Sequence, residues 1–195
     1  MAKGFSTLAI IKLTSRPQSV IENCKTTPQY HGNKDKLNFT SKQLNMDINK
    51  IETQLLIKKS PKTIYSAFVD PKITTQFWFT KSSGKLENGK TVTWEWEMYG
   101  VKDEVTVLEL KPAEKITIHW GNPKSKVDFI FEEFKKGQTL VKIKCYDFEH
   151  KKKDLIPTML DYMGGFTTVL DGLKCFLEHK VNLNLIKDKY PDKIK

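Results

Sequence analysis

The sequence predicts an α+β domain in which a curved antiparallel sheet of about seven strands wraps around a long C-terminal helix, with two short helices after the first strand. Two observations support this fold class. Short apolar-polar alternating segments recur about every ten residues with no helix between them, which requires antiparallel pairing. A broad apolar stripe near the C-terminus then predicts a helix that the sheet must cover.

The first strand and both short helices are marked by alternation and by capping residues. Residues 51–57 alternate as expected for a strand with one buried face. Ser60-Pro61 opens a helix, with the serine as cap and the proline in the first helical position. Asp70-Pro71 interrupts that helix and restarts it, and the chain then runs into Phe77-Trp78-Phe79.

Turn residues delimit six further strands. Asn88-Gly89 predicts a two-residue hairpin between a strand at Lys85-Leu86 and a strand over residues 91–97. The other turns bound the remaining strands, and they are Tyr99-Gly100, Lys111-Pro112, Gly121-Asn122-Pro123 and Lys136-Gly137.

The last predicted element is a helix from Leu155 to Lys180, with Asp154 as its cap. Its apolar stripe consists of Met159, Met163, Phe166, Leu170, Leu173 and Leu177. Gly164, Gly165 and Gly172 interrupt it, and each costs about 1 kcal/mol relative to alanine. Three explanations are open for these glycines, namely close backbone approach, a bend, or space for a guest molecule.

Strand parity and the helix stripe together predict an aromatic interior that carries almost no titratable group. This interior is either packed by its own side chains or hollow. In the hollow case, the predicted ligand cavity is lined by Trp78, Trp94, Trp96, Ile118, Trp120, Phe129, Phe131, Ile143, Met159, Tyr162, Met163, Phe166 and Leu170.

Composition limits the classes of partner. About half of the net charge of +10 lies in residues 1–45, and the remainder is spread along the domain. The aromatic residues fall on the apolar side of the strands, which argues against a nucleic-acid partner. No apolar run approaches the roughly 20 residues that cross a bilayer, so no membrane insertion is expected. Three widely spaced cysteines are typical of reduced thiols and favour a cytoplasmic location.

The predicted domain covers residues 46–195, and residues 1–45 form an extension. The extension has seven Lys or Arg residues, two acidic residues and no sustained periodicity. We expect it to be poorly ordered. It is either a flexible tail or a product of start-site choice, because Met46 stands directly before the first strand.

Catalytic groups are scarce, so no catalytic residue, metal site or cofactor is predicted. Cys145 is the only thiol on the inner face and has no partner base, so packing is its simplest role. His119 faces outward, and the other histidines show no metal-ligand spacing. Glu95 and Glu97 share a face, but that face is the solvated one.

The order of elements and several motifs resemble the START-like helix-grip superfamily, also called polyketide-cyclase or birch-pollen-allergen-like. Within it, the chain is similar to bacterial single-domain homologues of the heat-shock-protein-90 ATPase activator. The motifs that carry this resemblance are residues 60–68 with Asp70-Pro71, Phe77-Trp78, residues 107–112, Gly137-Gln138-Thr139, residues 164–174 and Leu177-Glu178-His179. The resemblance implies an interior cavity for small hydrophobic molecules.

Three functions follow as hypotheses. The first is binding or transport of a small hydrophobic molecule, and it predicts that a charged residue at Trp96 or Met163 abolishes binding or folding. The second, implied by the resemblance alone, is a chaperone-associated cofactor that stimulates a heat-shock ATPase. The third is a cyclase-like or hydrolase-like enzyme, which the uncharged inner face argues against.

Overall fold

The computed structural model describes residues 49–121, 124–149 and 152–194 of the chain. The predicted extension and residues 122–123 of one predicted turn therefore lie outside the described residues.

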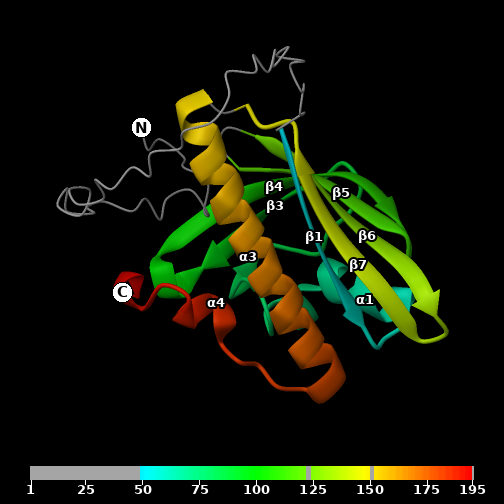
Figure 1. Cartoon of the computed structure of the whole chain (residues 1–195). Coiled ribbons are helices and arrows are strands. Elements are labelled where there is room, and N and C mark those ends of the chain that lie inside the picture. The colour runs from blue at the N-terminus through cyan, green and yellow to red at the C-terminus, as the bar shows by residue number, and fades with distance from the viewer. Residues whose placement is uncertain (1–48, 122–123, 150–151, 195) are drawn as a thin grey trace, which may run out of the picture. The chain divides into compact units, whose positions relative to one another are not determined.

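A seven-stranded antiparallel sheet forms the body of the domain, as predicted (Figure 1). Its order is β1-β7-β6-β5-β4-β3-β2, so strands two to seven form a meander and the first strand pairs with the last. The strands are β1 Lys50–Ile57, β2 Lys81–Ser82, β3 Thr91–Trp96, β4 Val101–Lys111, β5 Lys115–Trp120, β6 Ser125–Lys135 and β7 Gln138–Tyr146.

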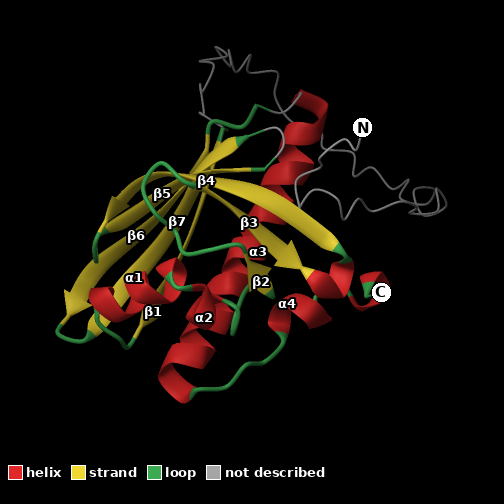
Figure 2. Ribbon diagram, turned by 180° about the vertical axis from the view of Figure 1, so that it is seen from behind, coloured by secondary structure: helices red, strands yellow, loops and turns green. Residues whose placement is uncertain are grey.

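The long helix α3, Lys152–His179, crosses one face of the sheet (Figure 1). The shorter helical elements are α1 Pro61–Val69, α2 Pro71–Thr74, η1 Glu97–Tyr99, α4 Leu185–Asp188 and η2 Pro191–Lys193. Seen from behind, α1 and α2 lie toward one end of the sheet, and α4 lies beside α3 (Figure 2). No helix in the described part of the chain is long and apolar enough to cross a membrane.

The short helices begin where their capping residues predict. The Ser60 hydroxyl accepts a hydrogen bond from the Thr63 amide at 3.3 Å, and Pro61 occupies the first turn. The Asp70 carboxylate accepts from the Lys72 amide at 3.1 Å and so caps α2. Both caps satisfy amides that have no partner within their helices.

Two predicted boundaries are wrong. The second strand lies at Lys81–Ser82 rather than Lys85-Leu86, because Leu86 is buried and its amide donates to the Val69 carbonyl of α1 at 3.3 Å. The Asn88-Gly89 turn does not close a hairpin. It fastens this loop to β4 instead, since the Asn88 side chain accepts from the Leu110 amide at 2.7 Å.

The long helix also starts earlier than predicted, at Lys152, so that Asp154 lies in its first turn. The Asp154 carbonyl accepts a hydrogen bond from the Thr158 hydroxyl at 2.7 Å. The acidic side chain is still favourable there, because the first turn carries the positive end of the helix dipole.

The inner face of the sheet follows the predicted parity, and α3 covers it. The inward residues of β3, β5, β6 and β7 are buried. At its far end α3 is tied to the edge strand β1. The Glu178 carboxylate accepts from the Lys58 amide at 2.7 Å, and the Lys174 ammonium donates to the Leu56 carbonyl at 2.9 Å.

One of the helix glycines has a clear packing role. A Cβ atom added at Gly172 would lie 3.0 Å from the Phe77 carbonyl oxygen and 3.4 Å from the Phe77 Cβ atom. This contact is backbone against backbone and cannot relax by a rotamer change. Of the three explanations for the glycines, close approach therefore holds for Gly172.

We predict that Gly172→Ala lowers the free energy of unfolding, because overpacking costs about 1–3 kcal/mol and alanine returns only about 1 kcal/mol of helix propensity. Gly164→Ala is the matched control. Its Cβ atom would meet only the flexible end of Lys189, at 3.3 Å, so its stability should equal or exceed that of the wild type. Urea denaturation compares the two. A Gly172→Ala variant as stable as Gly164→Ala would contradict this packing role.

Candidate functional site: the pocket beneath the C-terminal segment

The space between sheet and helix is occupied by aromatic rings in mutual contact. Trp78 lies at their centre, with its ring centroid 4.8 Å from Trp94, 5.8 Å from Trp120, 5.8 Å from Phe129 and 6.4 Å from Phe166. These separations are those of favourable edge-to-face and tilted aromatic pairs. The rings come from the loop after α2, from the sheet and from α3, so they join all three parts of the domain.

Twelve of the thirteen predicted cavity residues are buried in this interior. They are Trp78 of the loop after α2, Trp94 and Trp96 of β3, Ile118 and Trp120 of β5, Phe129 and Phe131 of β6, Ile143 of β7, and Met159, Tyr162, Phe166 and Leu170 of α3. Since the rings contact one another, these residues form a packed wall around Trp78.

The placement of Met163 in the interior is wrong, because its side chain is 38% exposed. The buried arc of α3 includes Gly165 and Gly172, and Gly172 faces Phe77. At roughly 100° per residue, Met163 lies about 20° beyond Leu170, on the opposite edge of that arc. The other stripe residues lie at Leu170 or on the side of it that the sheet and the Phe77 segment cover, so Met163 is left at the exposed edge.

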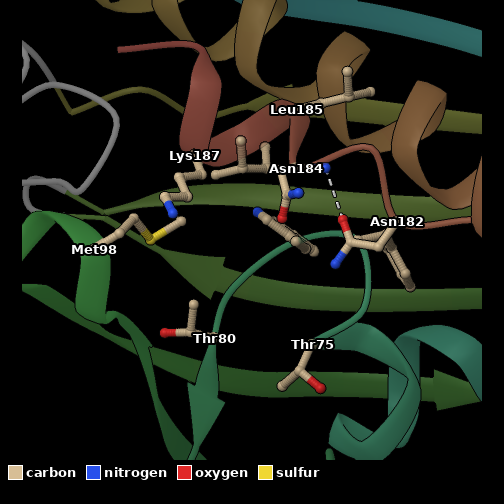
Figure 3. Close-up of a pocket in the computed structure, with 10 residues that line it drawn as sticks. Thr75, Thr80, Met98, Asn182, Asn184, Leu185 and Lys187 are labelled. Atoms are coloured by element: carbon tan, nitrogen blue, oxygen red, sulfur yellow. Dashed lines mark hydrogen bonds between the residues drawn. The ribbon is translucent and has the colours of Figure 1, made fainter. Parts of the chain in front are cut away.

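A pocket of about 250 Å³ opens at the edge of this interior. Its floor is made of Phe77 and Trp78, and Met98 of η1 forms one wall. Residues that follow α3 form the wall opposite Thr75 and Thr80 (Figure 3). The complete lining is Thr75, Phe77, Trp78, Thr80, Met98, Asn182, Asn184, Leu185, Ile186 and Lys187.

Half of this lining belongs to residues 181–194, which we call the C-terminal segment. Three side chains hold the segment in place. The Tyr99 hydroxyl donates to the carbonyls of Ile186 and, at 3.0 Å, of Lys187. The Lys189 ammonium donates to the Gly164 carbonyl at 2.6 Å and to the Thr168 hydroxyl at 3.0 Å.

The third attachment joins Tyr190 to Asp161 of α3, with 3.1 Å between the hydroxyl and the carboxylate oxygen. Burial raises the pKa of Asp161 to about 6, and the Tyr190 hydrogen bond and the Lys189 charge offset only part of that rise. The second carboxylate oxygen of Asp161 is buried and has no hydrogen-bond partner among the described residues. Burial likewise lowers the pKa of Lys189, while the charge of Asp161 opposes this change.

Only Trp78 of the predicted cavity set lines the pocket, so sequence reasoning missed most of this site. The helix α4 has four residues, too few for a periodic apolar pattern, and the Lys-rich composition of the segment resembles that of a solvated tail. The sequence features that could have pointed to this site are Tyr99 and Tyr190, two aromatic residues outside the predicted core. In the structure their rings lie 6.3 Å apart.

The polar groups that line the pocket are few. Lys187 is the only charged side chain in its lining. The hydroxyl of Thr75 donates to the Pro71 carbonyl, and that of Thr80 donates to the Glu95 carbonyl, so both are used in the backbone framework. Across residues 49–121, 124–149 and 152–194, no group of three His, Cys, Asp or Glu side chains is arranged to hold a metal ion.

Elsewhere in the interior, Cys145 is an unreactive thiol, because burial raises its pKa to about 12. A hydrogen bond with the Ser125 hydroxyl offsets part of that rise in pKa. Trp120 Nε1 is buried and has no hydrogen-bond partner in the described part of the chain. Trp120 and Ser125 are cross-strand neighbours in β5 and β6.

A curved antiparallel sheet that grips a long C-terminal helix defines a helix-grip domain of the START-like superfamily. Residues 58–178 match the family described as "Activator of Hsp90 ATPase homolog 1-like protein". The chain belongs to this family, which confirms the predicted resemblance. None of the curated protein sequences matches this chain.

Several solved structures are similar. Protein SSP2350 from Staphylococcus saprophyticus is 30% identical over 69% of this chain and 95% of its own, with a TM-score of 0.61. The Aha1 dimer from Colwellia psychrerythraea is 24% identical over 67% of this chain and 96% of its own, with a TM-score of 0.58. Protein MLL2253 from Mesorhizobium loti is 17% identical over 68% of this chain and 98% of its own, with a TM-score of 0.59. At these lower identities, the last two show the fold alone.

We predict that Trp96→Glu prevents folding and that Met163→Glu does not. Trp96 is 3% exposed, and an unpaired carboxylate buried there costs several kcal/mol. Met163 is exposed, so the same substitution should change stability by no more than about 0.5 kcal/mol. Circular dichroism during urea denaturation tests both. Unfolding of the Met163→Glu variant would place Met163 in the core after all.

We also predict that acidification tightens the docking of the C-terminal segment. Because the docked pKa of Asp161 lies above its ordinary value of 3.8, the docked state binds the proton more tightly. This stabilisation is complete below pH 3.8 and is lost as the pH rises through about 6. The titratable groups facing Asp161 are Lys189 and Tyr190.

Hydrogen exchange of the segment amides between pH 4.5 and 7.5, corrected for intrinsic rates, measures this dependence. Asp70 and Glu109 have lowered pKa values and act in the opposite sense, so the control is Asp161→Asn in the same buffers. The asparagine cannot ionise, and the difference between wild type and variant should shrink as the pH falls. A constant difference would mean that Asp161 does not titrate in this range.

Proposed function

We propose that this domain binds a small, largely apolar molecule with one polar end in the pocket between Trp78 and the C-terminal segment. The observation that carries the proposal is the make-up of the pocket. An aromatic floor of Phe77 and Trp78 faces a rim of Asn182, Asn184 and Lys187. Small-molecule sites typically combine a mainly apolar lining with a few polar groups that fix orientation.

The volume of the pocket limits the size of the molecule. An apolar cavity of about 150 Å³ holds a benzene molecule. A pocket of about 250 Å³ therefore suits one ring with a short substituent, or an aliphatic chain of similar bulk. In this proposal the ring stacks on Trp78, and the other buried rings hold the Trp78 indole in place.

The charge of the pocket lining indicates which kind of polar end the ligand has. Lys187 supplies a cation to the lining, and no acidic side chain lines the pocket. An anionic or hydrogen-bond-accepting end is therefore favoured over a cationic end. The proposal accordingly ranks benzoate and benzyl alcohol above benzylamine as probes.

The test compares these three probes with the full chain by ligand-observed NMR, together with native mass spectrometry of protein purified without detergent. Met98→Glu places a carboxylate in the pocket wall and should weaken benzoate binding at least about tenfold, or about 1.4 kcal/mol. Met163→Glu is the matched control, since Met163 lies outside the pocket lining and is exposed. Equal binding by the two variants, or no binding of any probe to the wild type, would overturn the proposal.

Family membership supports a second candidate, a chaperone-associated cofactor that stimulates the ATPase of heat-shock protein 90. A different measurement decides it. The chain should then raise the ATPase rate of the chaperone, and Met98→Glu should leave that stimulation unchanged. An unchanged ATPase rate and an empty affinity pull-down would overturn this candidate.

A further inference from the structure

We infer that the C-terminal segment, residues 181–194, is a releasable lid that opens as a unit to admit the ligand to the face of Trp78. The inference rests on the proposed function, because it concerns access to the same pocket. Five residues of the segment line the pocket, namely Asn182, Asn184, Leu185, Ile186 and Lys187. Without the segment, the aromatic floor has no cover on that side (Figure 3).

The segment has little structure that is stable by itself. Residues 181–184 have no regular secondary structure and are exposed. The helix α4 has four residues, and η2 has three. Neither contains a buried residue, and helices this short are not stable in isolation. The segment therefore depends on its attachments to the rest of the domain.

Those attachments are a few hydrogen bonds and a small amount of apolar packing, in which the partly buried side chains of Ile186 and Tyr190 lie against the core. Tyr99 holds the backbone of α4, Lys189 holds α3 at Gly164 and Thr168, and Tyr190 holds Asp161. Regions held by few buried apolar contacts open at a lower free-energy cost than the core. The core beneath is held by buried rings, so the segment can open while the sheet and α3 remain folded.

Two residues with positive φ mark the junction between α3 and α4, one directly before the segment and one within it. Lys180 has φ +60° and Asn184 has φ +54°, and both are non-glycine residues in the left-handed region. At Lys180 this conformation ends α3, with the Lys180 amide donating to the Phe176 carbonyl at 2.9 Å, and at Asn184 it is one that asparagine tolerates well. The exposed stretch between them is therefore where the backbone can rotate when the segment leaves α3.

The lid also explains Gly164, one of the three glycines whose purpose the sequence left open. A Cβ atom at this position would lie 3.3 Å from Lys189 Nζ. The absence of a side chain gives the Lys189 ammonium room beside the helix, where it donates to the Gly164 carbonyl at 2.6 Å. The glycine lets this contact form without any adjustment of the Lys189 side chain, whose flexible end would otherwise have to shift slightly.

Docking of the segment also carries an electrostatic cost at Asp161 and Lys189, which keeps the docking reversible. Burial disfavours the charged forms of both Asp161 and Lys189, and their mutual attraction compensates only in part. Both groups regain water when the segment leaves. The desolvation of Asp161 and Lys189 thus opposes the docked state.

The experiment is hydrogen exchange of the ligand-free full chain, with the exchange of 4-fluorobenzoate followed by fluorine NMR. Lys189→Met removes the ammonium but keeps an apolar stem, and Tyr190→Phe removes only the bond to Asp161. The matched control is Lys193→Met, because Lys193 lies in the same segment and is exposed. Amides of β5 and β6 report global stability in every variant.

We expect the segment amides of wild type to exchange faster than those of β5 and β6. Lys189→Met and Tyr190→Phe should each accelerate segment exchange at least about tenfold, with β5 and β6 unchanged, and should speed release of 4-fluorobenzoate. Lys193→Met should change neither.

Segment amides that exchange only as slowly as the sheet, or variants that all behave like Lys193→Met, would overturn the lid, even if 4-fluorobenzoate binds. Fast segment exchange without binding of 4-fluorobenzoate to any variant would instead overturn the pocket as its binding site, and with it the role of the segment as a lid.

Discussion

The contact of the Trp78 indole with the rings of the sheet and of α3 is the interaction on which the rest of the domain depends. Its centroid lies 4.8 Å from that of Trp94 and 5.8 Å from that of Trp120. Trp78 is in a loop, so its ring must be presented by the segment that passes under the helix. Gly172 allows that passage, because any side chain there would strike the Phe77 carbonyl.

The candidate site lies at the edge of the aromatic cluster. The rings of sheet and helix contact one another around Trp78, and the pocket described above opens beside them. Phe77 and Trp78 are each 5% exposed and form the floor of the one pocket described above. The domain thus presents a rigid aromatic surface, and what covers that surface decides access to it.

The cover and the core differ in how they are held. The core is stabilised by buried apolar area, which is large and non-directional. The C-terminal segment is held by hydrogen bonds of Tyr99, Lys189 and Tyr190, each of small net value, and by the partly buried side chains of Ile186 and Tyr190. This contrast allows one part of the chain to move while the other stays fixed.

The sequence by itself determined the fold class, the strand count, the caps at Ser60 and Asp70 and the inward residues of the sheet, because these follow from local periodicity and local hydrogen bonding. Only the tertiary structure decided that Met163 is exposed and that the pocket lies beneath α4. The exposure of Met163 depends on the Phe77 segment, which packs on the other edge of the buried arc of α3. The pocket depends on the C-terminal segment, which has no periodic pattern of its own and is placed by long-range hydrogen bonds that leave no local signal in the sequence.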